Sequence, residues 1–208
     1  MKTVHVELWS DFVCPWCWIA KRRLDQAIER LAGKVQVSIT NHAYRLAKGM
    51  APTDYASSLK MNLGGERQAK QMMDAVSAHG RIESLTYNFQ TMRFGDTRAA
   101  HSLVKSLNTE AERDKMIEAL SLASVTNGQD IFDHDVLRAV AAQAGLSPER
   151  IAAIDFDRVR DIEQDERRAS SVANGVPLFI FNDKAYISGA QPLEAFVAAL
   201  SQTAIDAP

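Results

Sequence analysis

Both ends of the chain show the alternation of hydrophobic and polar residues that is typical of β-strands. Residues 4–9 alternate apolar and polar side chains and residues 35–39 repeat the pattern, which predicts two strands. Between them, apolar residues recur at helical spacing from Ala20 to Leu31, and Gly33 is placed to end that helix. Strand, helix and strand with such short links predict a parallel βαβ unit with a right-handed crossover.

The middle of the chain, from about residue 53 to residue 173, shows helical periods and few strand signals. Glycines, prolines and capping residues divide this stretch into separate helices. The expected helices cover residues 55–63, 66–78, 97–107 and 111–125, a segment capped by Asp133, a short segment opened by Ser147 and Pro148, and residues 157–173. We expect the second of these helices to stop at Gly80.

The end of the chain returns to strands. Residues 176–181 are apolar enough for a buried strand, residues 184–188 pair back as a hairpin, and Pro192 opens a last helix. The order predicts an α/β domain with a helical insertion, because a helical block of this length is too long to be a loop. The predicted boundaries are residues 1–48 and 157–208 for the α/β domain and residues 49–156 for the insertion.

Composition and charge exclude several classes of protein. The chain has 208 residues, a mass of 23.0 kDa, a formal charge of −2 and a pI near 6.2. It therefore lacks the basic excess of a general nucleic-acid surface. It also has no apolar run of the roughly 18 residues that a membrane span needs. The first residues lack the continuous apolar segment of a signal peptide, so we expect a cytoplasmic protein.

The two cysteines of the chain lie in one tetrapeptide, Cys14-Pro15-Trp16-Cys17. A disulfide there closes a very short loop and stabilises the fold little, so chemistry explains the pair better than stability. Cys-X-X-Cys beside a βαβ unit is typical of thioredoxin-like redox sites. If Cys14 lies at the helix N-terminus, the helix dipole favours its thiolate. We expect Cys14 to be the exposed attacking sulfur and Cys17 the buried resolving thiol.

Two alternatives to a redox role stay open for the cysteine pair. A structural zinc site needs about four ligands, and the histidines lack His-x₃₋₅-His spacing, so we expect no metal. These histidines are His5, His42, His79, His101 and His134. An inert, buried pair is the second alternative, because free cysteine is often a core residue.

Three segments resemble a known family. They are residues 10–17 (SDFVCPWC), 175–181 (GVPLFIF) and 187–191 (ISGAQ). Nearly the whole chain resembles the DsbA-like thioredoxin-fold oxidoreductases, most closely their cytosolic FrnE-like branch. The resemblance implies a thioredoxin fold with a large all-helical insertion. It also implies that Pro177 is a cis-proline facing the cysteines, which presents the main chain of Val176 to a substrate strand.

Two related families with the same insertion are the 2-hydroxychromene-2-carboxylate isomerases and the kappa-class glutathione transferases. Their members typically carry a single serine or cysteine where this chain has both Cys14 and Cys17. This difference favours dithiol redox chemistry over glutathione conjugation or isomerisation.

Other residues near the motif are further candidates. Thioredoxin-fold relatives place a buried carboxylate near the position of Glu7, so we hypothesise that Glu7 accepts the proton of Cys17. An edge-facing, salt-bridged Glu7 is the alternative. Thr97 and His101 lie one helical turn apart in a stretch that resembles the FrnE-like branch, which suggests a shared substrate-binding face. A capped helix with a surface histidine is the alternative, and Asp11 is interpreted as a turn or cap residue.

We predict a thiol–disulfide oxidoreductase or isomerase that forms a mixed disulfide on Cys14, with Pro15, Trp16 and Val176 at the substrate. Disulfide-containing proteins or peptides are the expected substrates, glutathione is a candidate co-substrate, and no cofactor is required. One alternative is a glutathione-dependent isomerase or transferase of an aromatic small molecule. Another is a non-enzymatic peptide-binding module. We expect no nucleic-acid or membrane partner, and a homodimer is left open.

Overall fold

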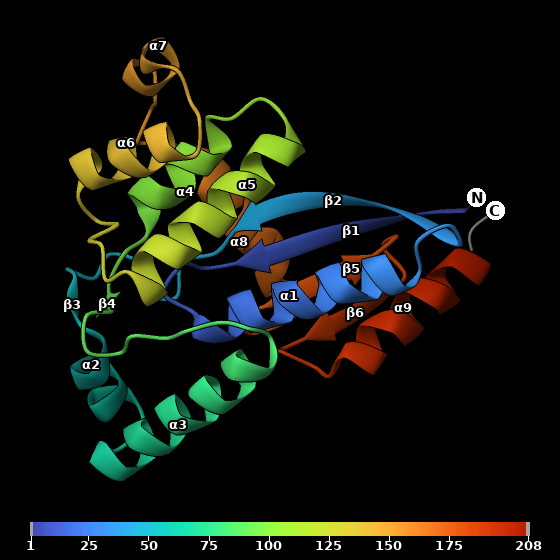
Figure 1. The fold of residues 1–208 in the computed structure, drawn as a ribbon, viewed down its shortest axis with the longest axis horizontal. Helices are drawn as coiled ribbons and strands as arrows, with labels where there is room; N and C mark the ends of the chain where they lie inside the picture. Colours follow the sequence, from blue (N-terminus) through green and yellow to red (C-terminus); the bar gives the residue numbers. More distant parts are fainter. Residues whose placement is uncertain (1, 207–208) are drawn as a thin grey trace.

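The computed structural model describes residues 2–206, and a four-stranded sheet forms its centre (Figure 1). The strand bounds are β1 Lys2–Ser10, β2 Val35–Ala43, β5 Leu178–Phe181 and β6 Ala185–Ser188. The strands lie in the order β2-β1-β5-β6. β1 pairs with β2 in parallel, whereas β5 is antiparallel to both β1 and β6. The α/β thioredoxin-like fold that the sequence predicts is confirmed.

Helices cover both faces of the sheet. Their bounds are α1 Pro15–Arg30, α8 Val159–Ser170 and α9 Leu193–Ile205. On one face, Leu8 of β1 belongs to a buried cluster with Leu24 of α1 and Phe196 of α9. On the other face, the neighbouring Trp9 packs with Ala169 of α8. Successive side chains of β1 therefore enter different cores, because strand residues alternate between the two faces of a sheet.

Within the described residues, the other elements form the helical insertion between β2 and α8. They are β3 Thr53–Asp54, α2 Tyr55–Asn62, α3 Glu66–Ile82, β4 Arg93–Phe94, α4 Arg98–Lys105, α5 Glu110–Ser121, the π-helix η1 Leu122–Thr126, α6 His134–Gln143 and α7 Pro148–Ala152. Figure 1 shows α2 and α3 on one side of the first turn of α1 and α4 to α7 on the other. Trp18 and Ile19 of α1 pack in one cluster with Tyr55 and Val76. The helix that carries the cysteines is therefore also part of a core of the insertion.

The insertion departs from the sequence prediction in its helix ends. α3 continues through Gly80 to Ile82 instead of stopping at that glycine. A Cβ atom at Gly80 would lie 2.6 Å from the ring of Tyr87, so the glycine allows the ring to pack closely against the helix. The predicted helix over 111–125 divides into α5 and η1, and the short pairing of β3 with β4 was not predicted.

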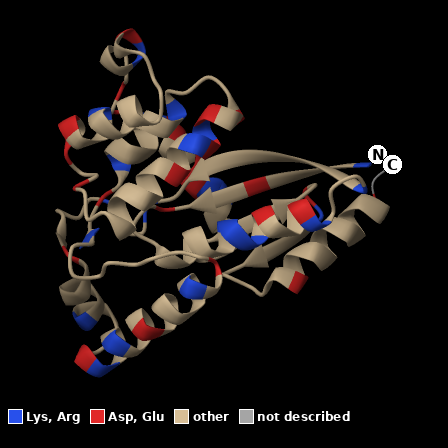
Figure 2. Ribbon diagram, in the orientation of Figure 1, with Lys and Arg blue, Asp and Glu red and all other residues tan. Residues whose placement is uncertain are grey.

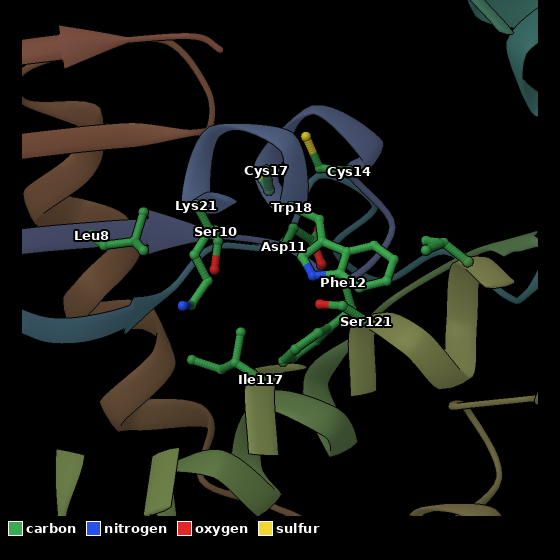
Figure 3. A pocket seen from close by; sticks show the side chains of 11 residues that line it. Leu8, Ser10, Asp11, Phe12, Cys14, Cys17, Trp18, Lys21, Ile117 and Ser121 are labelled. Carbon is green, nitrogen blue, oxygen red and sulfur yellow. The ribbon is translucent and has the colours of Figure 1, made fainter. Parts of the chain in front are cut away.

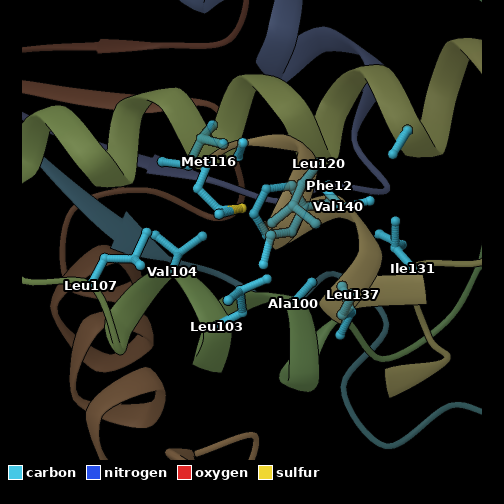
Figure 4. Close-up of a cluster of buried hydrophobic side chains, with 14 residues drawn as sticks. Phe12, Ala100, Leu103, Val104, Leu107, Met116, Leu120, Ile131, Leu137 and Val140 are labelled. Atoms are coloured by element: carbon cyan, nitrogen blue, oxygen red, sulfur yellow. The ribbon is translucent and has the colours of Figure 1, made fainter. Parts of the chain in front are cut away.

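Phe12, in the loop between β1 and α1, joins the two parts of the chain. Its side chain is 4% exposed and belongs to the buried cluster of α4, α5 and α6, with Leu103, Leu120 and Leu137. Figure 4 shows the Phe12 ring among these side chains. The loop that leads to the cysteines is therefore anchored in the insertion.

Charged residues of both signs are interspersed over the helices (Figure 2). Several pair with an opposite charge on the same or a neighbouring helix, such as Lys21 with Asp25 and Arg30 with Glu194. No helix within residues 2–206 is long and apolar enough to cross a membrane.

Replacing Phe12 with alanine should lower the free energy of unfolding by about 3–5 kcal/mol, because the change leaves a cavity in a buried cluster. Denaturant unfolding followed by circular dichroism measures this loss. The matched control is Tyr186→Ala, which removes an aromatic ring that is 61% exposed. That control should cost about 1 kcal/mol or less. Equal losses in the two variants would contradict the anchoring role of Phe12.

Candidate active site

Cys14 is the N-cap residue of α1, and the local sequence explains this position. Its backbone is extended, with φ −97° and ψ 103°, and Pro15 occupies the first turn, where a missing N–H costs no helical hydrogen bond. The Cys14 N–H donates to the Asp11 carbonyl at 3.1 Å, and the Cys17 N–H donates to the Cys14 carbonyl at 3.1 Å. The Cys14 side chain makes no capping hydrogen bond, so the helix favours a negative charge on its sulfur only through the positive end of the helix dipole.

Cys14 is less exposed than the sequence predicts. Its relative exposure is 7%, against 4% for Cys17, so the prediction of an exposed attacking sulfur is wrong. The Cys14 thiol donates to the Val176 carbonyl at 3.8 Å, and Ser121 and Val125 border the pocket that Cys14 lines. In Figure 3 the sulfur points away from the other side chains of this pocket. The Val176 main chain and the insertion together account for the low exposure.

Cys17 is the more protected of the two free thiols. Burial raises the pKa of Cys17 well above its usual value, and the hydrogen bond with Cys14 and the charge of Cys14 add to the increase. The main chain of Asp11 lowers this pKa, whereas the charge of Asp11 raises it. Cys17 is therefore held as a neutral thiol near pH 7.

The peptide bond between Val176 and Pro177 is cis, as the resemblance implies. The Gly189 N–H donates to the Pro177 carbonyl at 2.8 Å, and Leu178 begins β5 as a fully buried residue. These contacts hold the loop against the sheet and leave the Val176 carbonyl beside the Cys14 sulfur.

The two residues between the cysteines contact aromatic side chains of the insertion. The Tyr87 hydroxyl donates to the Pro15 carbonyl at 2.7 Å, and the ring centroids of Trp16 and His79 are 5.5 Å apart. Pro15 is buried and Trp16 is half-buried. Of these two predicted substrate contacts, Trp16 therefore offers more side-chain surface.

A buried arginine ties α1 to α3 and to the loop after β6. The Arg23 side chain is 7% exposed, and its Nε donates to Glu83 Oε1 at 2.7 Å. Its Nη1 donates to the carbonyls of Ala190 and Gln191 at 2.8 and 3.1 Å. Breaking such a buried pair is strongly destabilising, so this contact fixes α1 relative to the loop that also supports Pro177.

Asp11 is the site residue that the sequence interpretation missed. A turn or cap residue is expected to be open to solvent, but the Asp11 side chain is 0% exposed. Its Oδ1 accepts a hydrogen bond from the Thr97 hydroxyl at 2.6 Å, and its Oδ2 accepts one from the Leu46 N–H at 2.7 Å. Asp11 also lines the same pocket as Cys14 and Cys17. Its position three residues before Cys14 was the available signal.

Thr97, the N-cap residue of α4, and His101 lie one helical turn apart as predicted, but both are buried. Their exposures are 1% and 4%, so the alternative of a surface histidine is wrong. His101 Nε2 lies 3.1 Å from the Tyr44 carbonyl and 3.5 Å from Asp11 Oδ1. The structure therefore brings both residues to Asp11 beneath the cysteine loop, and not to an open substrate groove.

The structure does not bring Glu7 to the cysteines. Glu7 lies on the same face of β1 as Trp9, which α8 covers, whereas α1 packs on the opposite face. Its carboxylate pairs with His42 Nε2 at 3.1 Å and with Arg168. The hypothesis that Glu7 accepts the Cys17 proton is therefore wrong, and the salt-bridged alternative describes this residue.

Lys21 lines the pocket one helical turn beyond Cys17 (Figure 3). Burial works against its charge, but Asp25 and Asp114 lie 2.9 and 3.0 Å from its Nζ and raise the pKa of Lys21 above its usual value. Lys21 is therefore a paired cation at neutral pH. Over residues 2–206, no group of three or more His, Cys, Asp or Glu side chains is arranged to hold a metal ion.

Residues 5–201 match the family model of the DSBA-like thioredoxin domain. The chain belongs to the DsbA-like thioredoxin domain family. No curated protein matches its sequence. Among solved structures, this DsbA-like chain is similar to a probable DsbA oxidoreductase from Streptomyces coelicolor, with a TM-score of 0.87 and 28% identity over 96% of this chain and 89% of that one.

Two more distant structures share the fold of this DsbA-like protein. A 2-hydroxychromene-2-carboxylate isomerase has a TM-score of 0.68 at 15% identity and covers 95% of both chains. The cytosolic disulfide reductase DsbM from Pseudomonas aeruginosa, solved with GSH, has a TM-score of 0.66 at 15% identity and covers 95% of this chain and 98% of that chain. At this identity, both show the DsbA-like fold alone.

Replacing Glu7 with glutamine should leave the pH profile of thiol–disulfide exchange unchanged, because the Glu7 side chain faces α8. The variant should lose about 1 kcal/mol of stability or less, since Arg168 is 46% exposed and keeps Asp183 as a partner. Stopped-flow reaction with a chromogenic disulfide measures the profile, and thermal unfolding measures the stability. A displaced pH profile would contradict the placement of Glu7 outside the site.

Proposed function

We propose that the protein is a thiol–disulfide oxidoreductase that uses Cys14 and Cys17 as a redox dithiol. The main support is the location of two free cysteines at the N-terminus of α1, with the Cys14 sulfur beside the Val176 main chain. A dithiol at a helix N-terminus is suited to reversible disulfide formation, because the positive end of a helix dipole favours a negative charge. Membership of the DsbA-like family agrees with this chemistry.

Cys14 is the attacking sulfur in the proposed reaction. Its thiolate attacks one sulfur of a substrate disulfide, and a new S–S bond forms between them. The substrate S–S bond breaks, and the second substrate sulfur leaves with the electron pair as a thiolate. An extended substrate segment beside the Val176 main chain, with Trp16 at its side, would place its sulfur next to Cys14.

Cys17 completes the reaction as the resolving thiol. It loses its proton and attacks the Cys14 sulfur, so the Cys14–Cys17 bond forms and the mixed disulfide breaks. The substrate sulfur leaves as a thiolate, and the two electrons that reduce the substrate come from the dithiol. The same steps in reverse would oxidise or isomerise a protein disulfide.

Glutathione is the proposed reductant that restores the dithiol, and the cytoplasm is the proposed compartment. The structural neighbour DsbM is a cytosolic disulfide reductase that was solved with GSH. One glutathione thiolate would open the Cys14–Cys17 disulfide as a mixed disulfide on Cys14. A second would release glutathione disulfide and leave both cysteines reduced.

Replacing Cys17 with serine should trap a mixed disulfide on Cys14, because the resolving sulfur is absent. Replacing Cys14 with serine should prevent formation of that adduct, since the raised pKa of Cys17 keeps this sulfur a neutral thiol. Mass spectrometry after reaction with oxidised glutathione measures the adducts, and thermal unfolding verifies that both variants fold.

Two results would contradict this proposal. One is a wild-type protein that forms neither a mixed disulfide nor a Cys14–Cys17 disulfide with oxidised glutathione or a disulfide peptide. The other is a Cys17→Ser variant that retains the full activity of the wild type on a glutathione-dependent aromatic substrate. That second outcome would favour the isomerase or transferase alternative.

A further inference from the structure

One edge of the central sheet is open in its first half. β2 is an outer strand of the order β2-β1-β5-β6, so one side of its main chain has no neighbouring strand. We propose that residues 35–39, the open edge of β2, pair with the same residues of a second copy of this chain. The two strands would run antiparallel about a twofold axis at Val37 and join both sheets into one. This inference does not depend on the proposed redox function.

The hydrogen bonds of β2 show which of its main-chain groups point away from β1. The N–H groups of Asn41 and Ala43 donate to side-chain carboxylates of α5 and α8, at 3.2 and 2.7 Å. These acceptors lie outside the sheet. Because main-chain groups alternate between the two sides of a strand, the N–H groups of Val37 and Ile39 also point outward.

The helices protect only the second half of this edge. The acceptors of the Asn41 and Ala43 N–H groups are Glu110 of α5 and Asp165 of α8. Figure 1 shows both helices near the end of β2 and no element on the outer side of its first half. No side chain or loop within residues 2–206 is hydrogen-bonded to the N–H groups of residues 37 and 39. Such unpaired groups along an outer strand are a template for another strand.

The sequence of β2 lacks the features that usually prevent this pairing. Val35–Ala43 has nine residues, VQVSITNHA, with no lysine, arginine, carboxylate, proline or glycine among them. Outer strands of natural proteins are commonly short or carry charges and prolines. The other edge of the sheet follows that rule. β6 has four residues, Asp183 and Lys184 precede it, and the Ser188 carbonyl accepts a hydrogen bond from the Gln191 side chain.

The apolar side chains of the open edge favour an identical strand as its occupant. Val37 and Ile39 are half-buried and pack at the margin of the core that β1, α1 and α9 form. In the proposed pair, Val37 lies opposite Val37 of the partner subunit, and Ile39 lies opposite Val35 of the partner subunit. Each copy would cover the exposed part of the other's side chains, and β-branched pairs of this kind stabilise neighbouring strands.

The main-chain hydrogen bonds fit a twofold axis at Val37, the middle of the open edge. A symmetrical pair of identical strands uses the same surface of both copies. Val37 would exchange both of its main-chain hydrogen bonds with Val37 of the partner subunit. The Ile39 N–H would donate to the carbonyl of Val35 of the partner subunit. In each copy the Val35 N–H already donates to the Leu31 carbonyl at 3.1 Å, so it needs no partner across the axis.

Polar and charged side chains agree with this register. Gln36 would lie opposite Ser38 of the partner subunit, and both side chains are exposed and polar. Lys34 would lie opposite Thr40 of the partner subunit, next to Glu110 of the partner subunit, which accepts from the Asn41 N–H in its own chain. The register therefore brings opposite charges together and places no like charges opposite each other in the paired strands.

The open edge lies at the opposite end of the sheet from the redox motif. Val37 pairs with Val4 near the start of β1, whereas Cys14 and Cys17 follow the end of that strand. A variant that prevents the pairing should therefore keep the rate of thiol–disulfide exchange. Failure of this proposal and failure of the proposed redox function are distinguishable, because assembly and exchange are measured separately.

Sedimentation velocity over a range of protein concentrations tests the proposal. The wild type should sediment as a dimer at high concentration and dissociate on dilution. Val37→Lys should raise the dissociation constant of the dimer by about tenfold or more, because like charges then lie directly opposite each other at the axis. Val37→Glu should have the same effect. An equimolar mixture of the two variants should recover the dimer, since opposite charges face each other in it.

Tyr186→Lys is the matched control, because it adds the same charge at a 61% exposed residue of the other edge strand. This control should leave the dissociation constant unchanged. A wild-type protein that stays monomeric at every concentration would overturn the proposal, even if its open edge binds an unrelated extended peptide. A dimer that persists in both Val37 variants would also overturn it. A mixture of these variants that stays monomeric would overturn the twofold axis at Val37.

Hydrogen exchange keeps the test decisive if the Val37 variants do not fold. In the wild type, the amide hydrogens of Val37 and Ile39 should exchange more slowly as the protein concentration rises, because pairing takes them out of water. The amide hydrogen of Tyr186, on the opposite edge, is the reference and should show no dependence on concentration. Equal exchange of the Val37 and Ile39 amides at low and high concentration would contradict the pairing.

Discussion

The geometry of the redox motif depends on the packing of one aromatic ring. Phe12 lies two residues before Cys14 and is buried among the side chains of α4, α5 and α6. Trp9 is buried on the opposite side of the loop, against α8. The intervening chain is thereby fixed at both ends, and so is the Asp11 carbonyl that accepts the Cys14 N–H. Hydrophobic burial thus determines where α1 begins and which of the two sulfurs lies at the positive end of its helix dipole.

The insertion completes this arrangement by holding α1 from several sides. Trp18 of α1 packs into the cluster of α2 and α3, and Tyr87 donates a hydrogen bond to the Pro15 carbonyl. Arg23 connects Glu83, the C-cap residue of α3, to the carbonyl of Ala190. A helix held in this way cannot move relative to the Val176 loop without breaking buried polar contacts, which is costly. The same contacts explain why the motif is less exposed than its position at a helix start suggests.

The sequence predicts the elements well because each has a local cause. The alternating residues 4–9 lie in β1, as predicted. Gly33, which has a positive φ, follows the end of α1, also as predicted. Gly80 misleads, because its role is a long-range contact with Tyr87 that no local pattern contains. The hydrogen bond from Thr97 to Asp11 joins residues that are 86 positions apart in the sequence. Such contacts follow from tertiary packing, so composition and periodicity do not reveal them.

The two acidic residues near the motif show how position on the sheet decides chemistry. Glu7 points to the α8 face, where its carboxylate pairs with Arg168 and contacts His42 Nε2 at 3.1 Å. Asp11 lies past the end of β1, on the side where α1 begins, and its neighbours are the Thr97 hydroxyl, the Leu46 N–H and His101 Nε2. The hydrogen bonds from Thr97 and Leu46 hold the orientation of the Asp11 carboxylate. The carboxylate on the strand is therefore committed to the α8 face, whereas the carboxylate in the loop belongs to the packing beneath the redox motif.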